Sequence, residues 1–490
     1  MVPVASFTTS GQLRQLKADG GGNIRDLGGW ATASGKPVRY GLIYRGAEWN
    51  GKYNLTQEGI DALRAVGMKA ELDLRSGNEA LYIGKSPLGD DVTYIRIHNE
   101  DYYESGLQNR KDLYRRDLDF VFDCVGNDKP VFFHCHIGAD RTGTLAVLLE
   151  GLLGVGESDL YKEYELTTFS YFDTHRYKEN IDGILNYIRS LDGETLTDKF
   201  YTYCHTELGL SAREIADFRQ KMLGTVYPAD VRNLIGEAAG TGATSLDLST
   251  YDFEAEALAG VMPEGSNLLV TVAPASGITG QNIICDGLCQ SLVLTDGADF
   301  GTPAAFTAEQ ASFTTSVKGY KTLVLPFEAE VPEAFTATEA TSVSGSTVNT
   351  TAVTTIGADK PVMVQGEGTL ELTANYATRS ATPDDGPENG LLQGTYKAVS
   401  APLGSYVMQR QNGVTGFYQV ADAITVGAFR AWLNVPASGV KAFYLADEAT
   451  LLKDPKDPKD PKDPIFNLAG QRVSKADKGV YLRNNKKILY

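Results

Sequence analysis

Two residues in this chain, Cys135 and Arg141, combine a nucleophilic sulfur with a guanidinium group at a spacing that suits one phosphate group. A thiolate attacks phosphorus without a base, and the guanidinium fork matches two oxygens of a phosphoryl group. The backbone between them is long enough to curl around the phosphate and point its N–H groups inward. The residues expected to bind phosphate in this way are His136, Ile137, Gly138, Ala139, Asp140 and Arg141.

The residues on either side of this loop predict the geometry that the chemistry needs. Residues 129–133 are an apolar, aromatic-rich stretch typical of a buried strand, and Cys135 follows it closely. After Arg141, leucines recur at helical spacing up to a glycine stop at Gly154. The loop therefore joins a strand to a helix N-terminus, where unpaired N–H groups and the helix dipole favour an anion and the thiolate of Cys135. Gly138 allows the backbone to curl.

These residues predict a phosphomonoester hydrolase that forms a phosphocysteine intermediate and needs neither a metal nor a cofactor. Asp140 is the acid nearest in sequence to protonate the leaving oxygen, and Thr142 can hydrogen-bond the sulfur in the hydrolytic step. Asp101 is the rival acid, because its polar stretch at 98–103 could fold over the pocket, although a solvated loop is the simpler interpretation. The opposing hypothesis, a buried structural cysteine, explains neither the strand nor the helix in register with the loop.

Histidines flank the nucleophile on both sides. His134 is expected to orient the loop by hydrogen bonding, and His136 to line the pocket mouth, where it adds positive charge at lower pH. Two imidazoles with one residue between them and no third ligand are a weak metal signal. We interpret the other histidines as ordinary surface or core residues, namely His98, His175 and His205.

The loop resembles that of the bacterial tyrosine-phosphatase family with dual or triple specificity toward phosphoproteins and phosphoinositides. Further similar stretches are 23–29, 44–46, 73–76 with Glu79, and 208–222, so the resemblance spans roughly residues 15 to 225. It implies an α/β phosphotyrosine-phosphatase-like fold with Asp140 as the general acid. Many members have a lysine where this chain has Ala139, which favours phosphotyrosine over highly charged inositol lipids.

Charged residues in the similar stretches are expected to form scaffold ion pairs under the site. These residues are Arg25, Asp26, Asp73 and Arg75. The alternative is that Arg25 or Arg45 reaches the substrate.

With 490 residues, the chain is expected to hold more than one domain. We predict a catalytic domain over 1–228, an all-β, sandwich-like accessory region over 229–452, and a Lys-Asp-Pro linker over 453–464. A short β tail over 465–490 follows. It is either a sorting or attachment segment or an ordinary folded tail. Strong helical patterns are absent after residue 228. Cys285 and Cys289 could form a disulfide or simply pack, and a two-cysteine metal site is the least favoured interpretation.

The accessory region and the tail resemble segments found on exported proteins of Gram-negative anaerobes, which implies a periplasmic or cell-surface location. A net charge of −17 argues against nucleic acid or an anionic membrane as the general partner. The basic stretch 110–116 is a local exception that either recruits substrate or is an exposed helix face. No apolar run of 18 residues exists to span a bilayer.

The expected substrate is a phosphotyrosine-containing protein, with a phosphoinositide or inositol phosphate as the alternative. The alternative to an enzyme is that the protein is a surface adhesin with a vestigial phosphatase domain. The intact Cys135, Asp140 and Arg141 argue against that hypothesis.

Overall fold

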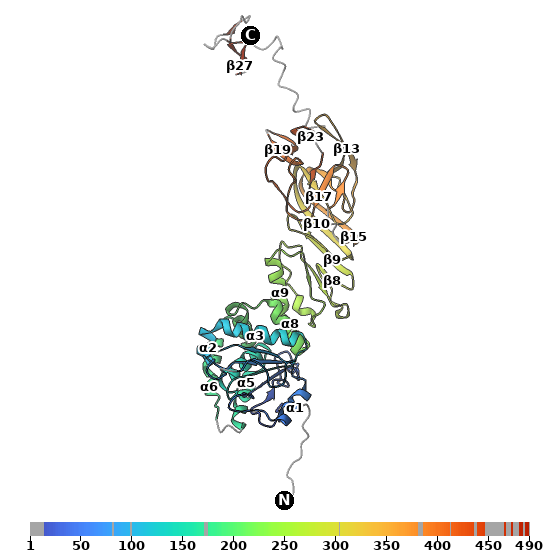
Figure 1. The fold of residues 1–490 in the computed structure, drawn as a ribbon. Coiled ribbons are helices and arrows are strands. Elements are labelled where there is room, and N and C mark those ends of the chain that lie inside the picture. The colour runs from blue at the N-terminus through green and yellow to red at the C-terminus, as the bar shows by residue number, and fades with distance from the viewer. Residues whose placement is uncertain are drawn as a thin grey trace. The chain divides into compact units, whose positions relative to one another are not determined.

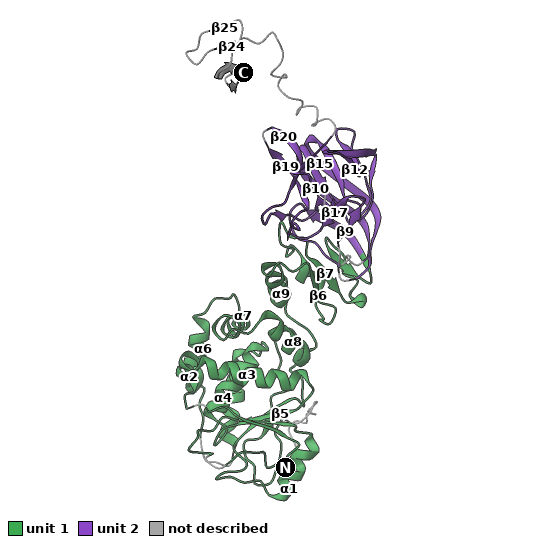
Figure 2. Cartoon of the chain, turned by 45° about the horizontal axis from the view of Figure 1, so that its top comes forward, with its two compact units in different colours: residues 1–288 green, residues 289–490 purple. Residues whose placement is uncertain are grey.

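The chain divides into two compact units in the computed structural model, residues 1–288 and residues 289–490 (Figure 2). The predicted catalytic boundary after residue 228 falls inside the first unit. The structure describes residues 14–80, 83–98, 100–170, 175–302, 304–380, 386–411, 413–435 and 439–445, together with the strand segments 465–466, 472–473, 480–483 and 486–489.

The first unit contains a five-stranded sheet among helices α1 to α8 (Figure 1). The order of its strands is β1-β2-β5-β3-β4. β1 is antiparallel to β2, and the other neighbours are parallel. The predicted strand at 129–133 is confirmed as β5, which is buried along its length because both faces of the sheet are covered. The strands are β1 Arg25–Asp26, β2 Ile43–Gly46, β3 Ala70–Asp73, β4 Thr93–Arg96 and β5 Val131–His134.

Two hydrophobic clusters cover the two faces of this sheet. Successive side chains of a strand point to opposite faces, so Phe133 packs with the α4 leucines and Phe132 packs with Trp49 and with Leu63 of α1. The helices in and beside these clusters are α1 Gln57–Val66, α2 Tyr103–Asn109, α3 Lys111–Gly126, α4 Asp140–Leu152, α5 Glu157–Glu165, α6 Glu179–Arg189, α7 Leu196–Thr202 and α8 Ala212–Leu223, with the 3₁₀ turn η1 Leu166–Phe169 and the π turn η2 Tyr203–Glu207.

Helix boundaries follow local sequence signals. The predicted helix after the loop is confirmed as α4, whose leucines are buried and whose chain turns away at Gly154, with a φ of +83° that suits glycine. The stretch 208–222, which resembles the family, contains most of α8, and Ser211 and Glu214 form a capping box at the start of this helix.

Helix α9, Pro228–Gly240, contradicts the expectation that helical patterns are absent after residue 228. Pro228 stands in its first turn, and Val231, Leu234 and Ile235 form a short buried stripe. The helix packs in one cluster with residues of three parallel strands. The further elements of the first unit are β6 Ser245–Asp247, β7 Leu269–Val272, β8 Ile283–Cys285, and the 3₁₀ turns η3 Ala255–Leu258 and η4 Pro274–Ser276.

The second unit is built from strands, as predicted. The long strands β10 and β15 pair antiparallel from Phe306 opposite Arg379 to Leu323 opposite Val362. Sandwich-like packing of the region stays a prediction. The strands are β9 Leu288–Thr295, β10 Phe306–Leu323, β11 Ala329–Glu330, β12 Thr336–Ser344, β13 Thr347–Val353, β14 Thr355–Ile356, β15 Val362–Arg379, β16 Glu388–Asn389, β17 Leu392–Thr395, β18 Val399–Ser400, β19 Tyr406–Gln411, β20 Val414–Gln419, β21 Thr425–Val426, β22 Arg430–Leu433 and β23 Ala442–Leu445.

The C-terminal segment contains short antiparallel strands where the sequence predicts a β tail. They are β24 Ile465–Phe466, β25 Arg472–Val473, β26 Val480–Arg483 and β27 Lys486–Leu489, in the order β25-β24-β26-β27. The predicted linker at 453–464 lies outside the described residues.

Two further expectations concern cysteines and membranes. Cys285 and Cys289 are free thiols, so of the two main alternatives the structure has packing and not a disulfide. Among the described residues, no helix has the length and apolar character needed to cross a bilayer.

Candidate active site

The loop 135–139 connects the end of β5 to the start of α4, as the sequence predicts. Cys135 is only 2% exposed, and it directly follows the central strand of the sheet. Gly138 has a φ of +71°, and a Cβ at this position would lie 2.2 Å from the carbonyl oxygen of Gly46. The loop therefore curls tightly against β2, at a point where only glycine fits.

The carbonyl groups of the loop are bound by the surrounding scaffold. The Asn23 amide donates to the carbonyl oxygens of Ile137 and Gly138 at 3.1 and 3.0 Å, and the Glu48 N–H donates to that of His136 at 3.0 Å. The N–H groups of residues 136–139 donate no hydrogen bond to another described residue. The peptides thus point their acceptors outward and keep their donors available for an anion.

Arg141 contacts a carboxylate that the family resemblance already included. Its two terminal nitrogens donate to the Glu79 oxygens at 2.6 and 2.9 Å, and Nη1 also donates to the Leu74 carbonyl at 3.3 Å. This bidentate pair is the largest of the effects that lower the pKa of Glu79 to about 2. Glu79 therefore fixes the guanidinium of Arg141, and the side chain remains 14% exposed.

Asp140 is held by two residues that are distant in sequence. Arg176 donates from Nε to Oδ1 at 3.0 Å and from Nη2 to Oδ2 at 3.1 Å, and the Tyr103 hydroxyl also donates to Oδ1. The Tyr103 hydroxyl shares a second hydrogen bond with the hydroxyl of Tyr164. Neither Arg176 nor Tyr103 is marked by any motif in the sequence, so the sequence analysis missed both.

Thr142 and Ala139 are both fully buried beside the loop. The Thr142 hydroxyl has no hydrogen-bond partner among the described residues, although it is enclosed. Ala139 stands at the N-cap position of α4 and adds no cation to the loop. A buried hydroxyl without a partner is uncommon and is compatible with a role toward a bound intermediate.

His134 orients the loop by hydrogen bonds, as the sequence analysis expected. Its Nδ1 lies 3.1 Å from the Cys135 carbonyl oxygen, and its Nε2 lies 3.0 Å from Oε1 of Glu71. Trp49 donates to the same Glu71 oxygen at 2.8 Å. Burial lowers the pKa of His134, but the hydrogen bond to Glu71 and the nearby Asp73 carboxylate outweigh it, so the net direction is upward.

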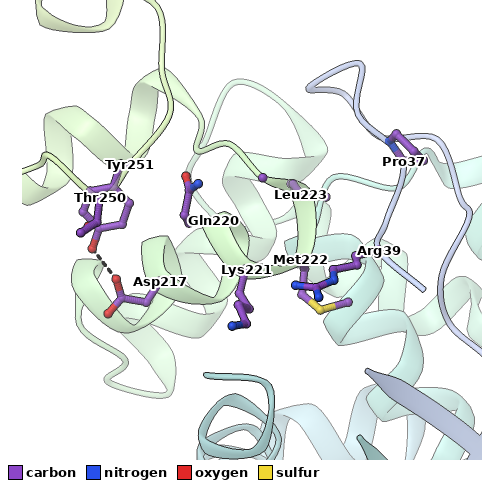
Figure 3. A pocket seen from close by; sticks show the side chains of 10 residues that line it. Pro37, Arg39, Asp217, Gln220, Lys221, Met222, Leu223, Thr250 and Tyr251 are labelled. Carbon is purple, nitrogen blue, oxygen red and sulfur yellow. Dashed lines mark hydrogen bonds between the residues drawn. The ribbon is translucent and has the colours of Figure 1, made fainter. Parts of the chain in front are cut away.

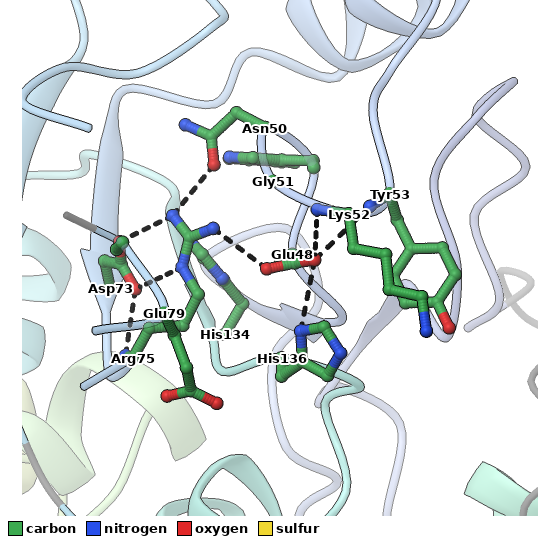
Figure 4. A network of polar contacts seen from close by, with 12 residues as sticks. Glu48, Asn50, Gly51, Lys52, Tyr53, Asp73, Arg75, Glu79, His134 and His136 are labelled. Atoms are coloured by element: carbon green, nitrogen blue, oxygen red, sulfur yellow. Dashed lines mark hydrogen bonds and ion pairs between the residues drawn. The ribbon is translucent and has the colours of Figure 1, made fainter. Parts of the chain in front are cut away.

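Glu48 joins the loop to the strands around it (Figure 4). It accepts a hydrogen bond from Nη1 of Arg75 at 3.0 Å, and its Oε1 lies 3.1 Å from Nδ1 of His136. Arg75 also contacts Asp73 at 2.7 Å, which confirms their predicted scaffold pair. His136 remains 34% exposed next to the Tyr53 ring, 5.7 Å between ring centroids.

Arg25 and Arg45 belong to the scaffold. Both contact the buried Glu163 of α5, at 2.8 and 3.1 Å, and Arg45 also donates to the Gly138 carbonyl. Both side chains are at most 5% exposed, so the substrate-contacting alternative loses its support. Asp26 instead accepts from the backbone N–H groups of Gly28 and Gly41, both at 2.7 Å, so the expectation of an ion pair for this residue is wrong.

Asp101, the rival acid, precedes α2. Its Oδ2 lies 4.0 Å from Arg110 Nη1, and its side chain is 46% exposed. Within the basic stretch 110–116, Lys111 contacts Glu207 and Arg115 contacts Glu214. Three of its cations, Arg110, Lys111 and Arg115, thus have acidic partners, which fits the exposed-helix interpretation better than a phosphate-recruiting surface.

Two of the cavities among the described residues of the first unit are relevant to the candidate site. One, of about 500 Å³, is lined by Arg39, Lys221 and Tyr251 among others and includes none of the loop residues (Figure 3). The other, of about 810 Å³, is lined by residues 15–24 with Phe169 and Ser170. Asn23 lines the second cavity and also donates to the loop carbonyls, so this cavity borders the candidate site. No cluster of possible metal ligands occurs in the described part of the chain.

The comparisons with known proteins agree with this geometry. Residues 16–224 match the model of the tyrosine phosphatase family. These residues form a phosphatase-like catalytic domain, and a large all-β region follows it.

Among particular proteins, the chain is 29% identical over 187 residues to a "Putative tyrosine-protein phosphatase" of Cupriavidus necator, covering 34% of this chain and 67% of the relative. It is 29% identical over 131 residues to a tyrosine-protein phosphatase of Nostoc commune, covering 23% of this chain and 45% of the relative. The chain thus spans less than half of the second relative.

Solved structures that resemble the chain are TpbA of P. aeruginosa and the core catalytic domain of the PP-IP phosphatase SIW14 of S. cerevisiae. TpbA has 16% identity and a TM-score of 0.24, covering 35% of this chain and 97% of its own. SIW14 has 15% identity and a TM-score of 0.21, covering 34% of this chain and 91% of its own.

Proposed function

We propose that the catalytic domain hydrolyses phosphotyrosine in proteins through a phosphocysteine intermediate. The observation that carries this proposal is the loop itself: its carbonyl groups bind the scaffold, its N–H groups remain available, and Cys135 and Arg141 stand at its two ends. The tyrosine phosphatase family match over 16–224 supports it.

The reaction has two steps. In the first, the Cys135 sulfur forms a bond to phosphorus while the bond from phosphorus to the phenolic oxygen breaks, and Asp140 gives its proton to that oxygen. In the second, water attacks phosphorus, Asp140 takes a proton from the water, and the sulfur–phosphorus bond breaks to release phosphate. Arg141 and the loop N–H groups stabilise the charge on the phosphoryl oxygens in both steps. The Thr142 hydroxyl, which is buried and has no partner among the described residues, assists the departing sulfur.

Phosphotyrosine is the first choice of substrate because the charge around the loop is modest. Ala139 adds no cation, and the guanidinium groups of Arg141 and Arg176 each face a carboxylate. A substrate with several phosphates, such as a phosphoinositide or inositol phosphate, would need more uncompensated positive charge. It is therefore the second candidate, within the dual or triple specificity that the loop resemblance implies.

We also propose that the protein is exported to the periplasm or cell surface, because the all-β region and tail resemble those of exported proteins. Cell fractionation with an antibody to the catalytic domain tests this location, and recovery with the cytoplasmic fraction contradicts it. If the protein is instead a surface adhesin with a vestigial phosphatase domain, it will hydrolyse none of the phosphorylated substrates.

The experiment is a phosphate-release assay over phosphotyrosine peptides, phosphoinositides and inositol phosphates. Wild type is compared with Cys135→Ser, Asp140→Asn and a control, Cys285→Ser, which changes a half-buried thiol outside the loop. We expect Cys135→Ser to abolish release and the control to retain it. Asp140→Asn should slow release about 100-fold or more from substrates with poor leaving groups. If Asp140→Asn keeps full activity on them, Asp101 becomes the candidate acid.

A further inference from the structure

The carboxylate of Asp140 accepts hydrogen bonds unequally on its two oxygens. Oδ1 accepts from the Tyr103 hydroxyl and from Nε of Arg176, whereas among the described residues Oδ2 accepts from Nη2 of Arg176 alone. A carboxylate oxygen has room for about two donors. Oδ1 is therefore fully occupied, and Oδ2 keeps one lone pair for a further partner.

Arg176 is fixed in place by the backbone as well as by its side chain. The Thr168 hydroxyl accepts from the Arg176 N–H at 2.9 Å and donates to the Arg176 carbonyl at 3.1 Å. Thr168 lies in η1, and the neighbouring Thr167 accepts hydrogen bonds from Arg25 and Asn23 of the loop scaffold. The Arg176 side chain is 17% exposed, so it forms part of the wall around Asp140.

Tyr103 adopts a backbone conformation that a tyrosine rarely takes. Its φ is +57°, and its N–H donates to the Thr144 hydroxyl of α4 at 2.9 Å. A non-glycine residue in this region is strained and persists where the surroundings enforce it, often at functional sites. Here the strained residue is the one whose hydroxyl binds Asp140.

We propose, on the basis of the proposed function, that Arg176 and Tyr103 are positioning residues that hold Asp140 as a base for hydrolysis of the phosphocysteine. The three donors fix the position and orientation of the carboxylate that accepts a proton in the second step. The lone pair on Oδ2 takes one proton from the attacking water, as the oxygen of that water bonds to phosphorus and the sulfur of Cys135 leaves. The protonated Asp140 then gives this proton to the next leaving group.

The test separates the two steps by stopped-flow kinetics with 2,4-dinitrophenyl phosphate, whose leaving group needs no proton. The burst phase reports phosphorylation of Cys135, and the steady state reports hydrolysis. For Arg176→Met we expect an unchanged burst rate and a steady-state rate about 10- to 100-fold lower. Arg176→Lys, which keeps the charge but not the fork, should recover part of the loss. Tyr103→Phe, which removes only a hydroxyl, should lower the steady-state rate about fivefold.

The control is Arg189→Met, because Arg189 also contacts a carboxylate, that of Glu157, but at the end of α6. It should leave both phases unchanged. The inference is overturned if burst and steady state fall together in Arg176→Met, since that indicates a general structural role, or if neither falls. Tyr103→Phe decides the matter if Arg176→Met does not fold. A wild-type enzyme without turnover, or an active Cys135→Ser, refutes the proposed function instead.

Discussion

The thiols of this chain should differ in reactivity by orders of magnitude. Cys124 is 2% exposed and Cys204 is fully buried, and burial raises the pKa of each thiol to about 12. Only the thiolate reacts with alkylating reagents. At pH 7, five units below that pKa, about one Cys124 or Cys204 thiol in 100,000 is ionised, against about 3% for an ordinary thiol with a pKa near 8.5.

Cys135 stands in different surroundings. It precedes the N-terminus of α4, where unpaired backbone N–H groups and the helix dipole favour an anion. Short exposure to iodoacetamide at pH 7 should therefore modify Cys135 together with the half-buried Cys285, and spare Cys124 and Cys204. Vanadate, which occupies a phosphate site, should protect Cys135 and leave Cys285 unprotected.

The assay is mass spectrometry of tryptic peptides over time, with phosphatase activity measured on the same samples. Activity should fall in step with modification of Cys135. The reasoning is refuted if Cys124 or Cys204 reacts as fast as Cys135, if vanadate gives no protection, or if activity follows Cys285.

Two further predictions concern a loop glycine and a buried acid. Gly138→Ala should lower kcat/KM at least 100-fold, because its φ is +71° and its Cβ would clash with the Gly46 carbonyl; near-wild-type turnover would contradict this geometry. Asp117 is 1% exposed, its carboxylate has no hydrogen-bond partner among the described residues, and burial raises its pKa well above the usual value. Because the pKa of Asp117 is higher in the folded state than in the unfolded state, the free energy of unfolding of the wild type falls as pH rises above about 4. Asp117→Asn should therefore stabilise the protein by about 1–2 kcal/mol at pH 8 and little at pH 4, measured by urea unfolding; equal stability at pH 8 would count against it.

The fold was predictable where the signals are local. The strand β5, the helix α4 and the capped helix α8 each carry their own pattern of apolar spacing, glycine stop or capping box. Helix α9 was missed because its apolar stripe is short and stands next to a long region of strand-like sequence. Its three buried apolar residues identify it as a packed helix only in the tertiary structure, where they share a hydrophobic cluster with residues of β6, β7 and β8.

The partners of the charged residues in the scaffold were harder to predict from the sequence. Arg25 and Arg45 share Glu163, which no motif identified and which lies more than 100 residues away. Arg75 does pair with Asp73, two residues before it, as the sequence indicated. Short-range pairs follow from the turn that contains them, whereas long-range pairs depend on which elements the sheet brings together.

By itself, the sequence determined the strand, loop and helix that hold Cys135 and Arg141, because the apolar stretch, the loop glycine, the leucine spacing and the glycine stop that predict them fall within one continuous segment. Only the tertiary structure decided what surrounds them: Glu79 on Arg141, and Tyr103 with Arg176 on Asp140. These residues stand 62, 37 and 36 positions from their partners. Hydrogen bonds between such distant side chains leave no periodicity or spacing in the sequence, since they exist only after the hydrophobic core has packed the separate elements together.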